Sequence, residues 1–554
     1  MSFLRVFVDN PLLTLFACMG VGLVLGKIRI AGISFGAAGA LFAALGLSSL
    51  VYLADLPNLS GQVDAAGQEL DRATVALPGF LTAFSLAVFC YTVGISAGPS
   101  IVAAFKTGWK PVIIASVSIV AMAGAAYGTG KAFGLRMGEI AGIYAGTGTA
   151  TAALGVVQEQ FKAAGSVEDV SGASVGYAIG YPIGVTATIV CIVAVIRLGQ
   201  RFPLPEDTEV VSPMQVRTLL IGPDITGLTV AEAAQRYAFV VSRVTRDGST
   251  ATAEADRRLQ PGDLVTVTGR TDDLERAADA LGGFSSTEPW WDRSEIDYRR
   301  ITLSNPDLAT HTVDSLGLYD RFGAVISRVR RADVDLLATP DLKLQMGDRL
   351  RITAPRRIMR KVGDFIGDSE RAAGDINPIG LGIGFSLGLL FGLLTIPLGG
   401  GSSLVIGSAS GPLIIGTVLG AIGRTGPVVW LLPGTVTSTL NQFSLLLFLV
   451  AVGTGAGQSL VAAVQGGQWA AVAVVALITS LTHALCVVLG VRVLIRFGTA
   501  RTLGALTGSQ LNPGVYGFAF ERMPDPRVAL GYALLFPVIM VGKVLVDQLM
   551  VAFL

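Results

Sequence analysis

A 21-residue apolar stretch occurs twice in this chain, and the two copies lie 359 positions apart. The first copy reads FSLAVFCYTVGISAGPSIVAA over residues 84–104, and the second reads FSLLLFLVAVGTGAGQSLVAA over residues 443–463. Of the 21 positions 12 are identical, and they include a GxxxG pair in each copy, Gly94/Gly98 and Gly453/Gly457, which we interpret as close helix contacts. Two related apolar halves around a polar middle are typical of membrane transporters built from internal repeats.

The composition of the 554-residue chain predicts several membrane-spanning segments. Hydrophobic residues make up 51% of the chain and charged residues 15%, and the mean hydropathy is +0.63. These values exclude an ordinary soluble protein, and a net charge of +1 gives no indication of nucleic-acid binding. The four cysteines lie in apolar stretches and only two histidines are present. We therefore expect no metal site, no redox centre and no cofactor.

Each half contains six apolar segments, and the basic residues between them predict their orientation. Lys27, Lys110, Arg197, Arg424 and Arg492 should face the cytoplasm, because basic residues favour that side. The chain satisfies this pattern if each half has five crossings and one re-entrant segment, a count that makes the halves inverted repeats with both termini outside. The exceptions are Lys131 and Arg136, which then lie outside. The segments are expected near residues 11–29, 32–54, 78–105, 111–133, 137–157 and 173–199, and near 377–396, 403–423, 434–460, 468–491, 499–518 and 528–553.

The polar middle is itself duplicated. The sequence VSRVTR at 241–246 returns as ISRVRR at 326–331, and LQPGD at 259–263 returns as LQMGD at 344–348, both after 85 residues. Each unit reads as short alternating strands, a Gly-Asp turn, another strand and a closing helix, which predicts a small α+β domain. The expected organisation is an N-terminal membrane repeat (1–200), two α+β domains (205–287 and 288–372) and a C-terminal membrane repeat (376–554).

These features together resemble the aspartate:alanine exchanger family of bacterial secondary transporters, and most closely its succinate-exporter branch. The polar units resemble TrkA C-terminal (RCK-C) domains, and local matches include GGSSL at 400–404 and two GYAxxxP motifs at 176–182 and 531–537. The resemblance implies exchange or export of small carboxylates, such as succinate, or aspartate against alanine. It also implies an α-helical multi-pass protein of the bacterial inner membrane, a homodimer, and cytoplasmic TrkA-C domains that could bind a regulatory ligand.

The re-entrant segments supply the candidate substrate site. An anion at mid-membrane needs its hydration replaced, and the free N–H groups at helix N-termini can do this. The first tip offers Thr147, Gly148, Thr149 and Thr151, and the second offers Ser509, Gln510, Asn512 and Pro513. The tip pattern of the family ends in proline, which this chain has at Pro513 but not at Ala150. The alternative is that both tips are packing faces of small residues.

Three ionisable residues within the apolar segments are further candidates, since such residues are rare in membranes. Lys543 could bind a substrate carboxylate, or it could form an ion pair with Asp547 one helical turn away. His483 is expected to be a hydrogen-bonded core residue rather than a proton relay. Glu139, at the start of the first re-entrant segment, is expected at the membrane interface.

The motifs do not favour an enzyme, since nucleophile-elbow, Walker and metal-ligand patterns are all missing from the sequence. The function predicted from sequence is a secondary transporter of small carboxylates that works by alternating access, in an elevator-like manner. Two alternatives remain open: an ion channel or cation antiporter regulated by TrkA-C domains, and a sensor that no longer transports.

Overall fold

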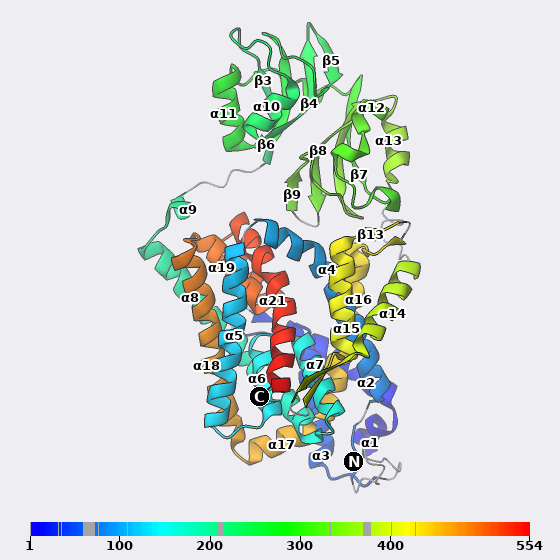
Figure 1. Ribbon diagram of the computed structural model, residues 1–554, viewed down its shortest axis with the longest axis vertical. Helices are drawn as coiled ribbons and strands as arrows, with labels where there is room; N and C mark the ends of the chain where they lie inside the picture. The colour runs from blue at the N-terminus through cyan, green and yellow to red at the C-terminus, as the bar shows by residue number, and fades with distance from the viewer. Residues whose placement is uncertain are drawn as a thin grey trace. The chain divides into compact units, whose positions relative to one another are not determined.

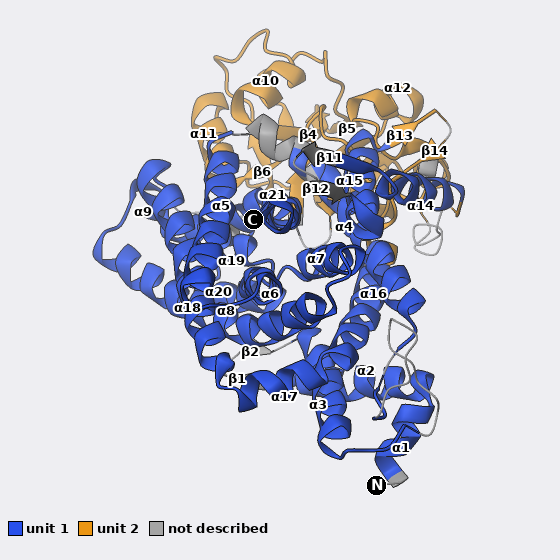
Figure 2. Ribbon diagram, turned by 60° about the horizontal axis from the view of Figure 1, so that its bottom comes forward, with its two compact units in different colours: residues 1–209, 379–423, 437–554 blue, residues 210–378, 424–436 orange. Residues whose placement is uncertain are grey.

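The computed structural model describes residues 2–30, 33–34, 36–58, 72–75, 77–107, 109–208, 214–331, 334–368, 378–399, 402–426 and 428–553. The chain forms two compact units, which Figure 2 distinguishes by colour. The helical unit comprises residues 1–209, 379–423 and 437–554, and the polar unit comprises residues 210–378 and 424–436. Residues 424–436 belong to the second apolar half by sequence, but by their contacts they group with the polar unit.

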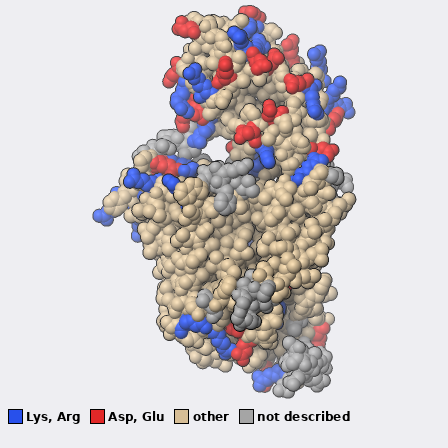
Figure 3. Space-filling view, viewed as in Figure 1, with Lys and Arg blue, Asp and Glu red and all other residues tan. Residues whose placement is uncertain are grey.

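The helical unit is a multi-pass membrane protein. Six helices within the described ranges are long and apolar enough to cross a membrane, or seven if the bent pair α1 (Ser2–Asp9) and α2 (Pro11–Lys27) counts as one span. The face seen in Figure 3 carries few charged side chains over this unit, as contact with lipid requires. The six helices are α4 (Gly79–Thr107), α5 (Trp109–Ala132), α8 (Val167–Arg201), α16 (Gly434–Gly455), α18 (Gln468–Val488) and α21 (Pro526–Phe553).

Both halves share two features in the same order, and their elements are labelled in Figure 1 and, for the hairpins and α20, in Figure 2. In each half, two apolar helices are joined by a short hairpin, and the fifth apolar segment is broken into two helices. In the first half these are α2, β1 (Arg29–Ile30), β2 (Ile33–Ser34), α3 (Ala38–Leu53), α6 (Met137–Thr147) and α7 (Thr151–Ala163). In the second they are α14 (Pro378–Gly392), β11 (Thr395–Gly399), β12 (Ser402–Val405), α15 (Gly407–Ile422), α19 (Thr499–Gln510) and α20 (Pro513–Arg522). A short helix, α17 (Gly457–Gln465), follows α16, and α18 ends in a π-helical turn, Leu489–Leu494.

The duplicated GxxxG glycines pack helices of one half against helices of the other. Gly94 and Gly98 of α4 face the backbone of α15, where a Cβ on Gly98 would lie 2.3 Å from Thr417 O. Gly457, at the start of α17, faces α3, where a Cβ would lie 2.5 Å from Ser49 N. The structure thus confirms the interpretation of these motifs as helix contacts.

Adding a methyl group at these contacts should destabilise the helical unit. Gly98→Ala and Gly457→Ala force backbone apart from backbone, at a cost of about 1–3 kcal/mol in overpacking. We expect a lower unfolding temperature and a lower yield of monodisperse protein in detergent. Gly124→Ala and Gly455→Ala are the matched controls, because no atom lies within 4 Å of the added Cβ. Equal stability of all four variants would contradict the packing role.

The polar unit contains two four-stranded antiparallel sheets with the same strand order. The first sheet runs β3-β6-β4-β5 and the second runs β7-β10-β8-β9. Buried side chains of each sheet and its flanking helices form separate cores, one around Val244 and Val267 and the other around Val329 and Ile352. The first set comprises β3 (Met214–Leu220), α10 (Val230–Tyr237), β4 (Phe239–Arg246), β5 (Ser249–Thr252), β6 (Leu264–Arg270) and α11 (Thr271–Leu281). The second comprises β7 (Ile296–Thr302), α12 (Leu318–Phe322), β8 (Val325–Arg331), β9 (Val334–Leu337), β10 (Arg349–Pro355) and α13 (Met359–Ile366).

The Gly-Asp turns are held by one arginine each. Arg246 Nε and Nη2 donate to the Asp263 carboxylate at 2.7 and 2.8 Å, and Gln260 N donates to it at 2.9 Å. Arg331 makes the same paired contact with Asp348, at 2.9 and 2.7 Å. Burial pushes the pKa of Asp263 upward, but the hydrogen bonds from Arg246 and Gln260 outweigh it and hold this pKa below its usual value.

Asp263→Asn should therefore reduce the stability of the polar unit without changing which substrate is transported. A lowered folded-state pKa means that the carboxylate stabilises the fold above about pH 4, and that this contribution is lost as the pH falls further. We expect a loss of about 1–3 kcal/mol near neutral pH in the full chain, measured by calorimetry. Asp256→Asn, at an exposed loop position, is the control. A changed substrate profile in Asp263→Asn would contradict this prediction.

Candidate functional site

The two segments predicted to be re-entrant break at equivalent positions, 362 residues apart. Helix α6 ends at Thr147 and α7 begins at Thr151, while α19 ends at Gln510 and α20 begins at Pro513. The residues that turn the chain, Thr149 and Leu511, both have left-handed φ angles, of 47° and 58°. Non-glycine residues rarely adopt this conformation, so the surrounding contacts must hold both turns in place.

The two tips bind each other. Thr149 Oγ1 donates to Gln510 O, and Gln510 Nε2 donates to Thr147 O at 2.7 Å. All three residues are buried. The predicted tip residues of the two halves, far apart in sequence, therefore lie together in one place in the helical unit.

Lys543 of α21 forms hydrogen bonds to both tips. Its Nζ donates to Gly148 O at 3.0 Å and to Ser509 O at 2.7 Å, and its side chain is fully buried. These carbonyls lie at the C-terminal ends of α6 and α19, where the helix dipole places negative charge. The ammonium thus occupies a position in which other transporters with broken helices hold a cation.

The ion pair that the sequence offered as an alternative for Lys543 is not formed. Asp547 is also fully buried, and neither of its carboxylate oxygens has a hydrogen-bond partner among the described residues. His483, predicted as a core histidine, is buried, with its ring nitrogens 3.3 Å from Ser509 O and 3.5 Å from Ser118 O. Glu139 is buried at the third position of α6, where it accepts a bond from Arg136 N at 2.9 Å.

A cavity of about 410 Å³ lies in front of the tips. Four of the nine predicted site residues line it: Thr149, Thr151, Asn512 and Pro513. The other five, Thr147, Gly148, Ser509, Gln510 and Lys543, are buried but are not among the residues that line it. Apolar side chains such as Phe89, Leu449 and Met540 form much of the remaining wall.

The two helix N-termini at this cavity differ. Asn512 caps α20, since its Oδ1 accepts from Gly514 N at 2.8 Å and from Val515 N at 3.3 Å. The residue that precedes α7, Ala150, provides no side-chain cap. Thr151 and Ala152, the first two residues of α7, line the cavity, so the positive end of this helix lies beside it, an arrangement that suits an anion.

Two tyrosines of α8 complete the polar side of the cavity, and neither was predicted from the sequence. Tyr177 OH lies 2.8 Å from Thr151 Oγ1, and Tyr181 OH accepts from Asn512 Nδ2 at 2.9 Å. Tyr177 belongs to the first GYAxxxP motif, and Tyr181 immediately precedes its proline. The GYAxxxP motif could have indicated both tyrosines, because it lies on the part of α8 that packs against the glycines of α6.

Glu159 is a further residue whose role was not predicted from the sequence. Its carboxylate accepts from Ser408 N at 2.7 Å and from Ala409 N at 3.0 Å, at the N-terminus of α15. This contact ties α7 of the first half to α15 of the second. The equivalent residue 362 positions later is Glu521 of α20, which is exposed. Glu159 and Glu521 are 362 residues apart, the same spacing as the two helix breaks, and this feature of the sequence could have indicated Glu159.

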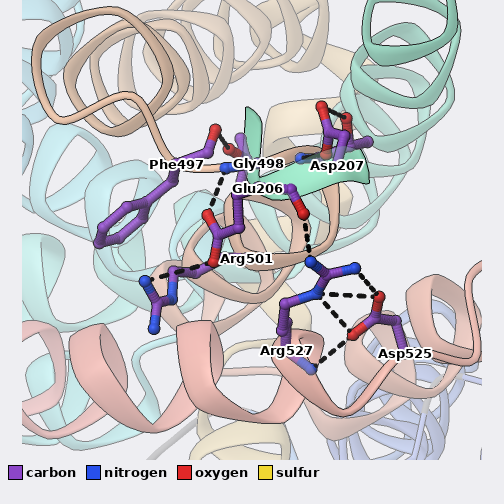
Figure 4. Close-up of polar contacts among 9 residues, drawn as sticks. Glu206, Asp207, Phe497, Gly498, Arg501, Asp525 and Arg527 are labelled. Atoms are coloured by element: carbon purple, nitrogen blue, oxygen red, sulfur yellow. Dashed lines mark hydrogen bonds and ion pairs between the residues drawn. The ribbon is translucent and has the colours of Figure 1, made fainter. Parts of the chain in front are cut away.

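The arginines near the start of α19 already have acidic partners (Figure 4). Glu206 of α9 (Pro205–Thr208) accepts from Gly498 N at 2.6 Å and pairs with Arg501 at 3.3 Å. Arg527 pairs with Asp525 at 2.6 Å, and Asp207 accepts from Thr499 N. These acids stabilise the positive end of α19, and the cluster is not a free anion site.

Comparison with known proteins places the chain among membrane permeases. Residues 14–198 and 380–552 match a family model described as a predicted permease membrane region, and residues 298–367 match the TrkA-C domain. The chain is 35% identical to an uncharacterized transporter of Geobacter sulfurreducens over 100% of both chains. It is 35% identical to one of Symbiobacterium thermophilum over 99% of each chain, and 32% identical to one of Cutibacterium acnes over 98% of each. No solved structure matches it.

Proposed function

We propose that this chain, which belongs to the aspartate:alanine exchanger family, is a secondary active transporter that exchanges or exports small carboxylates such as succinate, or aspartate against alanine. The observation that carries the proposal is the meeting of both helix breaks at one cavity. There an uncapped helix N-terminus, hydroxyl groups and an amide lie together between apolar walls. Such a site replaces the hydration of a carboxylate, while the apolar wall accepts a short carbon chain.

The proposed architecture is a pair of inverted repeats, each with five crossings and one re-entrant segment. The matched tips, hairpins and glycine contacts of the two halves support this arrangement. Lys131 and Arg136 conflict with the charge pattern. Arg136 forms an ion pair with Glu168, which offsets its positive charge. In this topology the polar unit is cytoplasmic, both termini are outside, and the membrane is the bacterial inner membrane.

We propose that, during alternating access, each half adopts the contacts that the other half makes in this structure. Glu159 joins α7 to the start of α15, whereas the equivalent Glu521 is exposed, and the cavity reaches from α20 to Gly36, Ala37 and Ala38 at the start of α3. In the opposite state, Glu521 would approach α3 and Glu159 would leave α15. We further propose that both tips move with α8 and α21 as one elevator-like unit, within a homodimer whose TrkA-C domains bind a regulatory ligand.

Cysteine labelling tests the topology. A single cysteine at the exposed Gln465 should react with a membrane-impermeant reagent in intact cells. One at the exposed Glu254 of the polar unit should react only after the membrane is opened. In the proposed topology the acidic loop around Asp64 also faces the exterior of the cell, but Asp64 is not among the residues that the structure describes. Labelling at position 254 in intact cells would contradict the inverted repeat.

A further inference from the structure

Asp547 is buried in an arrangement that an ionised carboxylate does not tolerate. It lies on the membrane-spanning helix α21 with 0% exposure, and both its oxygens are without a hydrogen-bond partner among the described residues. The hydroxyl group of Tyr144, on the helix α6 that packs against α21, is also buried without a partner there. An unpaired charge in such a place costs several kcal/mol, so the carboxylate must hold a proton or a cation.

The neighbouring cation is engaged elsewhere. Lys543 lies one helical turn from Asp547, a spacing at which the two side chains could pair. Its ammonium instead donates to Gly148 O and Ser509 O of the two tips. The residue next to Asp547, Gln548, is also committed, since its Oε1 accepts from Ser410 Oγ at 3.0 Å.

The surroundings favour a proton over a metal ion. No group of three or more His, Cys, Asp or Glu side chains that could hold a metal occurs in the described parts of the chain. Hard cations need several oxygen ligands, whereas a proton needs only one. Besides Lys543, the titratable groups that are not exposed on the helices packed against α21 are Cys90 and Tyr91 of α4, Tyr127 of α5, Glu139 and Tyr144 of α6, Glu159 of α7, Arg501 of α19 and Tyr516 of α20.

The pair is absent from the equivalent helix of the first half. The two GYA motifs align α8 with α21 at a spacing of 355 residues, which places Thr188 and Ile192 opposite Lys543 and Asp547. The helix packing common to both halves therefore does not require a buried lysine and a buried acid. Lys543 and Asp547 therefore occur in the second half only.

We infer that Asp547 is a proton-binding site and that it carries the proton coupled to substrate movement, an inference that rests on the proposed transport function. While Lys543 is bound to the tips, Asp547 is the neutral acid. When the site opens to one side of the membrane, the tips shift locally within the moving unit and Gly148 O and Ser509 O stop accepting from Lys543. The ammonium then turns to Asp547, and the carboxyl group releases one proton to that side. When the bonds to the tips form again with the site open to the other side, the carboxylate takes up one proton there, so each cycle moves one proton across the membrane.

The test is succinate-dependent proton flux in proteoliposomes that contain a pH-sensitive dye, with radiolabelled succinate counterflow measured in the same vesicles. The wild type should show both. Asp547→Asn and Asp547→Leu should retain counterflow within about threefold but lose at least about 90% of the proton flux. Both replacements are neutral and remove an unpartnered acid, so folding should survive, and counterflow itself reports folded protein.

The control is Glu168→Gln, at an acid whose side chain is 80% exposed, and it should retain both activities. Wild-type proton flux in either Asp547 variant would overturn the inference. Wild-type counterflow without proton flux would also overturn it and leave the proposed function intact. Absence of counterflow in the wild type would overturn both.

Discussion

Lys543→Met should reduce substrate exchange by at least about 100-fold. The substitution removes the only charged donor that Gly148 O and Ser509 O receive among the described contacts. A buried hydrogen bond from a charged group contributes about 1.5–3 kcal/mol, so two of them contribute about 3–6 kcal/mol, which exceeds the roughly 2.7 kcal/mol that corresponds to 100-fold. Because Asp547 is already unpaired in this structure, the variant adds no new unpaired acid, and its abundance should remain near that of the wild type.

The measurement is counterflow of succinate and of alanine, with Lys110→Met as the control at an exposed lysine of α5. If Lys543 holds the tips, both substrates lose transport to a similar degree. If Lys543 instead binds the substrate carboxylate, affinity for the dicarboxylate falls further than that for alanine, while the maximal rate is kept. Loss of folded protein that Asp547→Asn restores would indicate the ion pair. Either of the last two results would contradict a role for Lys543 in holding the tips.

Asn512→Asp should have the second large effect, and it separates an anion site from a merely structural cap. Aspartate is as good an N-cap as asparagine, so α20 should keep its first turn and the protein its abundance. A negative charge at the cavity wall, however, repels a carboxylate by several kcal/mol at short range. We expect carboxylate affinity to fall by at least about 100-fold in Asn512→Asp, as measured by competition in counterflow.

Asn512→Ala is the comparison variant. It removes the cap and the bond to Tyr181, so affinity should fall by about 1–3 kcal/mol, roughly five- to a hundred-fold. Succinate affinity in Asn512→Asp equal to or better than that in Asn512→Ala would contradict an anion site at this position.

The turn residues of the two helix breaks, Thr149 and Leu511, have left-handed φ angles that tertiary contacts must hold, and the sequence does not indicate them. The position of the breaks could be predicted, because Pro513 suits the first turn of a helix and the repeat carries this position over to the first half.

The packing role of Gly98 and Gly457 could also be predicted, since small residues at that spacing allow close helix contact. In the polar unit, the repeated Gly-Asp turn indicated both domains, although its arginine partners Arg246 and Arg331 appear only in the fold.

The orientation of side chains at the tips could not be predicted in the same way. Which residues face the cavity depends on how two broken helices from distant parts of the chain cross. Thr149 and Gln510 form hydrogen bonds to the opposite tip, and Lys543 donates to main-chain carbonyls. A motif of side chains does not predict bonds to main-chain atoms. Glu159 illustrates the same limit, because its partners are N–H groups of α15, 249 and 250 residues further along the chain.

Counterflow in liposomes that contain only the purified protein tests the central claim most directly. Vesicles preloaded with succinate, aspartate or alanine are diluted into a trace of the labelled substrate, without any imposed ion gradient. A carboxylate exchanger with a site at the two tips should accumulate label transiently against its concentration gradient, only when a substrate is inside, and Asn512→Asp should abolish carboxylate accumulation. Uptake of label that is independent of internal substrate, or ion conductance without accumulation, would contradict the claim and indicate a channel.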